Sequence, residues 1–261
     1  MIKCTKENAQ EIFDYIGKDY GKCAYLYIDL KKYGFDNENV NIWYQKEEDR
    51  IKVLMFQYYN GMHVFSRDNV FDAQDAAALI EERKPALVCG MGETISQIKP
   101  FVSEEEYEPE YGDVVRLEEY NGIAGDDVYL ASREELKEVA QLLAEDEELG
   151  GPYGFDLLYK QLLERYDDGF GRSWIRKDET GVISHSATYA ENEDLAVISG
   201  SIVRPDHRGR GEFAGQLGAT CRDLHNEGKE VISYLYDERA KRTNYKVGFR
   251  VLGEWAKLIR K

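Results

Sequence analysis

The sequence predicts a mixed α/β protein made of two consecutive domains, residues 1–120 and 126–261. Apolar residues recur at helical and strand-like spacings in alternation along the chain. A length of 261 residues is enough for two small domains. The order of expected elements in the first half begins again after residue 127. This repetition indicates an internal duplication of the fold, without a visible repeat in the sequence.

The first half is expected to contain helices, a hairpin and a strand–helix–strand segment. Asn60-Gly61 predicts the hairpin turn, and Asp72 is a favourable N-cap for a helix that ends before Pro85. In chain order the expected elements are helices over 7–18 and 23–33, strands over 40–45, 51–59 and 62–67, the helix after Asp72, a strand over 86–89, a helix over 93–101, an acidic segment over 103–111 and a strand over 114–117.

The second half is expected to follow a linker over 120–127, which contains two glycines and two aspartates. Ser132, with Glu135 three residues later, predicts a capping box, and Gly150-Gly151-Pro152 predicts a break in the chain. In chain order the expected elements are a strand over 128–131, helices over 132–143 and 155–166, strands over 173–176, 182–188 and 195–203, a helix from about 211, a strand over 231–236, another helix and a strand over 249–258.

The composition argues against several classes of partner. A net charge of −16 disfavours nucleic acid and anionic membranes, and weakly favours a cationic substrate. The sequence has no apolar run long enough to span a bilayer and begins with a polar segment that lacks a signal core, so we expect a cytoplasmic protein. Four scattered cysteines form no Cys/His cluster, so we expect reduced thiols and no metal site.

The clearest chemistry lies in the glycine-rich turn that follows the strand ending at Val203. Gly209 and Gly211 allow several backbone N–H groups to point at one spot, and the helix that starts near Gly211 adds its positive end. The same segment carries a local island of positive charge in an acidic chain. It consists of Arg204, His207, Arg208 and Arg210. Such a loop predicts a ligand with more than one phosphate.

Three interpretations of this loop compete. Gly209, Gly211 and Ala214 fit the dinucleotide pattern G-x-G-x-x-A, with Asp237 at the end of the next strand. However, Pro205 to Arg208 separate the strand from the glycines, and too few residues follow Asp237 to complete a parallel nucleotide-binding sheet. A surface turn with basic residues is the second interpretation, and an acyl-coenzyme A loop is the third.

The third interpretation is a resemblance. The segment V-R-P-x-x-R-G-R-G resembles the acyl-CoA-binding motif of the GNAT superfamily, the GCN-type N-acetyltransferases; Arg208 and Gly211 match, and Phe213 replaces a small residue. The resemblance extends over residues 126–261 in element order. It implies that Ile202, Val203 and Arg204 lie along the pantetheine arm. It also implies that pyrophosphate is held by the backbone amides of Arg208, Gly209, Arg210, Gly211, Glu212 and Phe213.

A second match to the same family lies downstream. Asp237 to Ala240, followed by Tyr245 and Gly248-Phe249, resembles Asn-x-x-Ala and Tyr-x-x-x-Gly-Phe. Asp237 stands where the family has Asn next to the cofactor. The family tyrosine, the usual acid for the leaving thiolate, falls at Asn244, while Tyr245 comes one residue late, a turn of about 100° on a helix.

The resemblance implies an acyl-CoA N-acyltransferase fold in the second half and an N-acetyltransferase that transfers an acetyl group from acetyl-CoA to a primary amine of a small or amino-acid-like molecule. Tyr245 is the expected acid and His185 a candidate base, although a hydrogen-bonded strand histidine is the other interpretation of His185. The other candidate bases are Ser199, Ser201, Glu191, Glu193 and Asp194. A non-catalytic acyl-CoA-binding regulatory module is the alternative function. We expect a monomer or homodimer.

The first half is expected to be a degenerate GNAT-like copy or an accessory domain. Where a phosphate loop belongs, the chain has Asp68-Asn69-Val70-Phe71-Asp72, with no glycine between His63 and Cys89. Backbone amides cannot converge there, and Asp68 and Asp72 repel an anion. The first half is therefore predicted to bind no coenzyme A.

Overall fold

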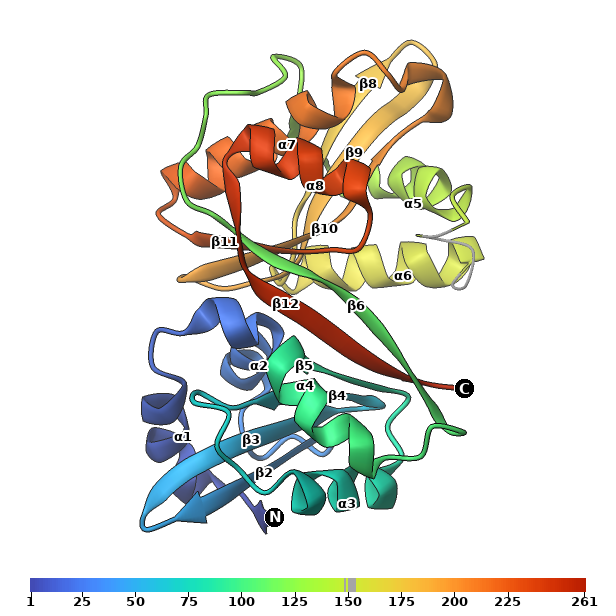
Figure 1. Cartoon of the computed structure of the whole chain (residues 1–261). Coiled ribbons are helices and arrows are strands. Elements are labelled where there is room, and N and C mark those ends of the chain that lie inside the picture. The colour runs from blue at the N-terminus through green and yellow to red at the C-terminus, as the bar shows by residue number, and fades with distance from the viewer. Residues whose placement is uncertain (148, 150–153) are drawn as a thin grey trace. The chain divides into compact units, whose positions relative to one another are not determined.

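The structure, a computed structural model, describes residues 1–147, 149 and 154–261 (Figure 1). They form two compact units. The first unit comprises Met1–Val114 and Val251–Lys261, and the second comprises Val115–Arg250. This division differs from the predicted ranges 1–120 and 126–261 because the end of the chain belongs to the first unit, where its strand pairs with that unit's sheet.

The first unit is a mixed sheet with helices. In chain order it contains β1 (Ile2–Lys3), α1 (Ala9–Ile16), α2 (Tyr20–Tyr33), β2 (Val40–Glu47), β3 (Arg50–Tyr58), β4 (Gly61–Phe65), α3 (Ala73–Arg83), β5 (Leu87–Met91), α4 (Gly92–Ile98) and β6 (Tyr107–Leu117). The strand order is β1-β2-β3-β4-β5, followed by β12 (Phe249–Arg260). β4 and β5 are parallel, whereas β1 to β4 pair in antiparallel fashion.

The local predictions for this half are largely confirmed. The Asp72 carboxylate caps α3 by accepting hydrogen bonds from the N–H groups of Gln74 at 3.0 Å and Asp75 at 3.1 Å. The predicted hairpin between β3 and β4 forms. Tyr58 pairs with Gly61, so the two residues of its turn are Tyr59 and Asn60 and not Asn60 and Gly61. The acidic segment was expected to precede a strand, but β6 already begins at Tyr107, whose hydroxyl donates to the Pro85 carbonyl.

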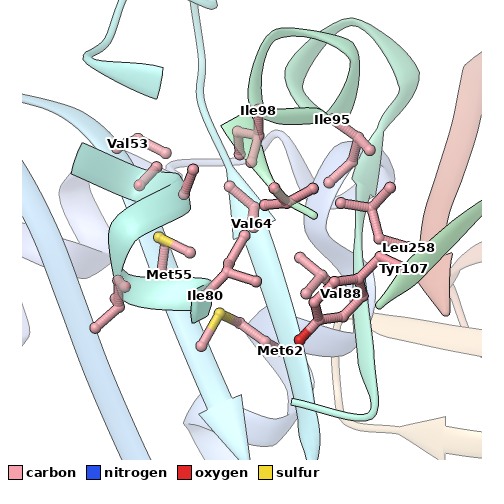
Figure 2. Close-up of a cluster of buried hydrophobic side chains, with 14 of the residues drawn as sticks. Val53, Met55, Met62, Val64, Ile80, Val88, Ile95, Ile98, Tyr107 and Leu258 are labelled. Atoms are coloured by element: carbon pink, nitrogen blue, oxygen red, sulfur yellow. The ribbon is translucent and has the colours of Figure 1, made fainter. Parts of the chain in front are cut away.

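The core of the first unit is built from apolar side chains of the first half of the chain and of the C-terminal strand (Figure 2). Alternate residues of β3, β4 and β5 meet α3 and α4 on one face of the sheet, as the period of two in a strand requires. Leu258 of β12 belongs to the same cluster. The labelled members in Figure 2 are Val53, Met55, Met62, Val64, Ile80, Val88, Ile95, Ile98, Tyr107 and Leu258.

The second unit has a sheet with two helices on each face (Figure 1). In chain order it contains β7 (Tyr129–Leu130), α5 (Leu136–Ala144), α6 (Gly154–Asp167), β8 (Ser173–Asp178), β9 (Gly181–Glu191), β10 (Leu195–Val203), α7 (Glu212–Asn226), β11 (Glu230–Leu235) and α8 (Glu238–Val247). The strand order is β7-β8-β9-β10-β11. One core joins the sheet to α7 and α8, and a second joins it to α5 and α6.

Three local predictions for this half have different outcomes. Glu135 accepts a hydrogen bond from the Ser132 N–H at 2.9 Å, as a capping box requires, although α5 begins only at Leu136. The expected break at Gly150-Gly151-Pro152 lies outside the described residues. The expected linker over 120–127 is packed into the second unit, because Gly125 donates its N–H to the Gly215 carbonyl on α7 at 2.9 Å.

The two halves of the chain, β1 to β6 and β7 to β12, repeat one order of elements, β-α-α-β-β-β-α-β-α-β, as the sequence predicts. In each, three antiparallel neighbours are followed by a parallel pair, β4 with β5 and β10 with β11. The last strand of each repeat extends beyond its own unit. Val115 of β6 packs in the core of the second unit, and Ala256 and Leu258 of β12 pack in the core of the first.

The position of β12 generates a prediction about stability. Leu258→Ala is expected to lower the free energy of unfolding by about 2–5 kcal/mol, since it removes a buried side chain and leaves a cavity. Val251→Ala, in the same strand but exposed, is the matched control and is expected to cost less than about 0.5 kcal/mol. Urea denaturation measures both. Hydrogen exchange in the Leu258 variant should accelerate at β4 and β5; acceleration confined to residues 115–250 contradicts the assignment of β12 to the first unit.

Candidate functional site

The pairing between β10 and β11 ends early. The two strands pair in parallel from Leu195 to Ile198 of β10, while β10 continues to Val203. On the other edge of β10, Arg204 donates its N–H to the carbonyl of Ile183 in β9. Because backbone groups alternate in direction along a strand, Ser201 and Val203 direct their N–H groups away from β9. In the described part of the chain, no strand pairs with β10 there, so its edge is available to a ligand.

A β-bulge in β10 produces this orientation. Ser199 is opposite Ala187 and Ile202 is opposite His185, so two residues of β10 lie between these pairs and only one of β9. Ile198 faces the core beneath α7, whereas Ile202, four residues later, faces the core beneath α5. Gly200 within the bulge has a φ of 62°, which favours glycine, and a Cβ there would overlap the Tyr189 hydroxyl.

His185 lies beside the bulge with both ring nitrogens occupied. Nδ1 is 2.7 Å from the Gly200 carbonyl oxygen, and Nε2 is 3.1 Å from the Ser173 hydroxyl. Since a carbonyl only accepts, Nδ1 carries the proton and Nε2 accepts from Ser173. Complete burial lowers the pKa of His185 to about 4. Of the two interpretations of His185 that the sequence leaves open, this geometry favours a hydrogen-bonded histidine within a strand over a general base.

The glycine-rich loop presents a row of backbone donors at the start of α7. Gly209 and Gly211 have φ angles of 82° and 85°, and added Cβ atoms there would meet no atom within 4 Å. Within the described residues, no acceptor is bonded to the N–H groups of residues 209–213. The Arg208 N–H, by contrast, donates to the Pro205 carbonyl at 3.3 Å. Five of the six predicted amides are therefore available to an anion.

The positive island around the loop is partly neutralised within the protein. Arg204 binds Asp206 through two hydrogen bonds of 2.8 and 3.2 Å and holds the pKa of that carboxyl well below its usual range. Arg208 folds back over the loop and donates to the Val203 carbonyl at 2.8 Å. Arg210 is exposed and has no ion pair in the described part of the chain. The one acid at the helix start, Glu212, is paired with Arg176.

Helix α8 places the other predicted residues. Asp237 is its N-cap and accepts from the Arg239 N–H at 2.6 Å. Ala240, Asn244 and Val247 share the face that packs inward, where Asn244 is 2% exposed. Tyr245 lies beside that face and is 37% exposed. The Asn244 amide donates to the Ala240 carbonyl, while its buried Oδ1 has no hydrogen-bond partner in the described residues.

The remaining candidate bases differ in availability. Glu191 is bound by Arg172 at 2.8 Å, and the Ser201 hydroxyl lies 3.0 Å from that of Ser186. Ser199 is half-buried on the strand before the bulge. Residues that our sequence analysis did not single out, Ser173 and Gly200, contact His185 directly. A glycine inside a strand pattern is a signal for a bulge and could have identified Gly200.

Among the residues that the structure describes, no group of three or more His, Cys, Asp or Glu side chains is placed to hold a metal ion. None of the described helices combines the length and apolarity needed to cross a bilayer.

Comparison with known proteins decides the fold. The chain matches a GCN5-related N-acetyltransferase-like protein from Streptococcus suis with 10% identity and a TM-score of 0.61, covering 99% of this chain and 100% of the other. A GCN5-related N-acetyltransferase from Sphaerobacter thermophilus matches with 13% identity and a TM-score of 0.65, covering 100% and 94%. The chain adopts the GNAT fold. The predicted fold class is thus confirmed.

The likeness to GNAT structures spans both units. A tandem GNAT protein from the clavulanic acid biosynthesis pathway, solved without AcCoA, matches with 11% identity and a TM-score of 0.56, covering 98% of this chain and 96% of the other. No protein-family model matches the sequence, and no curated protein does. At these identities the likeness concerns the fold, which is of the acetyltransferase type.

The buried histidine of this GNAT fold generates a prediction about pH. His185 has a pKa of about 4 in the folded chain, against about 6.5 when unfolded. The unfolded state therefore binds more protons between these values, so the contribution of His185 to the unfolding free energy falls as pH drops through that window. Replacing it in His185→Asn should make the slope between pH 6.5 and 5 shallower, by up to about 1.4 kcal/mol per pH unit. Urea denaturation at several pH values measures this; equal slopes in both proteins contradict it.

Proposed function

We propose that the second unit binds acyl-coenzyme A and transfers an acetyl group from acetyl-CoA to a primary amine of a small or amino-acid-like molecule. The observation that carries this proposal is the row of available N–H groups over 209–213, next to the unpaired edge of β10. The GNAT fold supports the same conclusion. A pyrophosphate requires several converging donors, and an amide-containing arm requires an exposed strand edge.

The residues present fit this ligand. The amides of residues 209–213 are proposed to hold the pyrophosphate, and Arg210 is the nearby cation without an internal ion pair in the described residues. Ser201 and Val203 offer N–H groups to the amide-containing arm. Arg176 offsets the charge of Glu212, which would otherwise repel the phosphates at the helix start.

The chemistry requires a neutral amine. Its nitrogen forms a bond to the acyl carbon while the carbon–sulfur bond of the thioester breaks, the amine loses a proton, and the thiolate gains one. An N–H of β10 is proposed to donate to the carbonyl oxygen as negative charge develops on it. Tyr245 is proposed as the proton donor to the thiolate. Ser199 or an ordered water remains as a candidate route for the amine proton, because His185 has no unoccupied nitrogen.

A second candidate function is a non-catalytic acyl-CoA-binding module. The observation that favours it is the buried Asn244 on the inward face of α8, with Tyr245 turned beside that face. An amide N–H can donate a hydrogen bond but is too weak an acid to transfer its proton to a thiolate. Turnover of acetyl-CoA over a panel of amines separates the two functions, since the module binds but does not turn over.

Binding at the glycine loop is testable by thermal shift. Coenzyme A at 100 times its dissociation constant is expected to add about 2.7 kcal/mol to the unfolding free energy. Gly211→Val should abolish the shift, because it blocks backbone approach and disfavours a φ of 85°. Gly228→Val is the matched control at the other end of α7, with a φ of 76° and open space around it. If both variants bind coenzyme A alike, the loop is misassigned.

The role of Tyr245 is testable by kinetics. Tyr245→Phe is expected to lower turnover by roughly 10–100-fold through loss of a general acid, with unchanged affinity for acetyl-CoA. Tyr166→Phe, another exposed tyrosine of the second unit, is the control. The assignment is wrong if Asn244→Ala impairs turnover while Tyr245→Phe does not.

The number of sites per chain tests the predicted division of labour. In the loop before α3, Asn69 N–H is bonded to the Ser66 hydroxyl, Val70 N–H to the Asp68 carboxylate and Asp72 N–H to the Gln45 side chain. These internal acceptors leave few donors for a phosphate. Calorimetric titration of the intact protein is expected to give one coenzyme A site per chain. Two equal sites, or one that survives Gly211→Val, contradict this expectation.

A further inference from the structure

The bulge in β10 reverses the direction of the backbone groups that follow it. Ile198 directs its carbonyl towards β11, where it accepts from the Ser233 hydroxyl, so regular alternation would turn Ser201 towards β9. The extra residue shifts this alternation by one, and Arg204 instead donates to the β9 side. Ser201 N–H therefore points to the unpaired edge because the bulge exists.

A bulge leaves one residue outside the ladder, and here a side chain takes up the lost hydrogen bond. The Gly200 carbonyl accepts from His185 Nδ1 at 2.7 Å. His185 lies on β9 directly opposite Ile202, the first residue paired after the bulge. Its other nitrogen accepts from Ser173 on β8 at 3.1 Å. Ser173, His185 and Gly200 thus form a buried hydrogen-bonded row across three neighbouring strands.

This row fixes the orientation of the imidazole. The Gly200 carbonyl requires a proton on Nδ1, and the Ser173 hydroxyl occupies the lone pair of Nε2. His185, Ser173 and Gly200 are all buried, so water does not compete for these bonds. Tyr189 also lies against Gly200, since a Cβ at that position would overlap the Tyr189 hydroxyl.

We propose that His185 is a positioning residue: its Nδ1–H holds the Gly200 carbonyl, and thereby keeps the Ser201 N–H directed to the edge of β10 where the acyl group is transferred. The inference rests on the proposed acyl-CoA function and adds a residue whose effect reaches the substrate through the backbone. In this role, His185 does not exchange a proton with the amine. A displaced donor of about 1 Å at such a site costs about 100-fold in rate.

The test compares two substitutions of His185. His185→Asn keeps an N–H donor near the position of Nδ1, whereas His185→Leu removes it at similar volume. His185→Leu is expected to lower kcat by about 10–100-fold with the dissociation constant for coenzyme A changed less than about threefold. His185→Asn is expected to retain kcat within about fivefold, because rescue needs only the donor to Gly200.

Other outcomes overturn the inference. Equal, large losses of kcat in both variants, with loss of the acid limb of the pH–rate profile, identify His185 as the general base. An unchanged kcat in His185→Leu shows that the contact has no part in catalysis. Loss of coenzyme A binding in proportion to lost folded protein, with normal kcat for the remainder, shows a purely structural role.

A second variant and a direct measurement make the result independent of folding. Ser173→Ala leaves the Nδ1 donor in place and is expected to keep kcat within about threefold. Nuclear magnetic resonance should detect a slowly exchanging Nδ1 proton on His185 in the wild-type chain. It should also show the Ser201 amide signal shifted in His185→Leu, with Val231 as the unaffected reference. An Nε2-protonated ring, or an unchanged Ser201 signal, overturns the assignment of His185 as a positioning residue, whatever the activity of the variants.

The same binding and activity measurements distinguish a failure of this inference from a failure of the proposed function. If the wild-type chain binds no coenzyme A in calorimetry, the acyl-CoA function and the catalytic part of the inference both fail. If it binds coenzyme A and acetylates an amine, but His185→Leu does so equally well, the function stands and the inference alone fails.

Discussion

The end of β10 pairing at Ile198 is the constraint on which the candidate site depends. Backbone N–H groups are strong donors that native structures almost always satisfy. Here Ser201, Val203 and the amides of 209–213 lie in sequence along one strand end and one helix start, with few internal acceptors in the described residues. A ligand rich in acceptors satisfies them together, which connects the shape of the sheet to the class of ligand.

The loop that precedes the helix before the parallel strand differs between the two units in whether its backbone N–H groups are bonded internally. Both have a loop between a strand and a helix before a parallel strand. In the first unit, Asp72 caps α3 with its own carboxylate, and Ser66 and Asp68 bind further amides of the loop. In the second unit, Gly211 caps α7 without a side chain. Internal carboxylates close the first loop to anions, and glycine leaves the second open.

The repeats are also joined through their last strands. Val115 at the end of β6 contributes to the second core, and Leu258 at the end of β12 contributes to the first. Each compact unit therefore buries apolar side chains that belong, in sequence, to the other half of the chain. The core of the first unit includes residues from the end of the chain, and the core of the second includes the end of β6. For this reason, a single boundary between the two halves of the sequence does not separate the two units.

The sequence by itself determined what depends on neighbouring residues: the cap at Asp72, the bounds of β10, and the open loop at Gly209 and Gly211. Glycine and short polar side chains impose these conformations locally. Only the tertiary structure decided that β12 pairs with β5 and that His185 contacts the Gly200 carbonyl in the bulge. These outcomes join residues far apart in the chain or depend on strand register, and register follows from the packing of whole faces, which no local pattern contains.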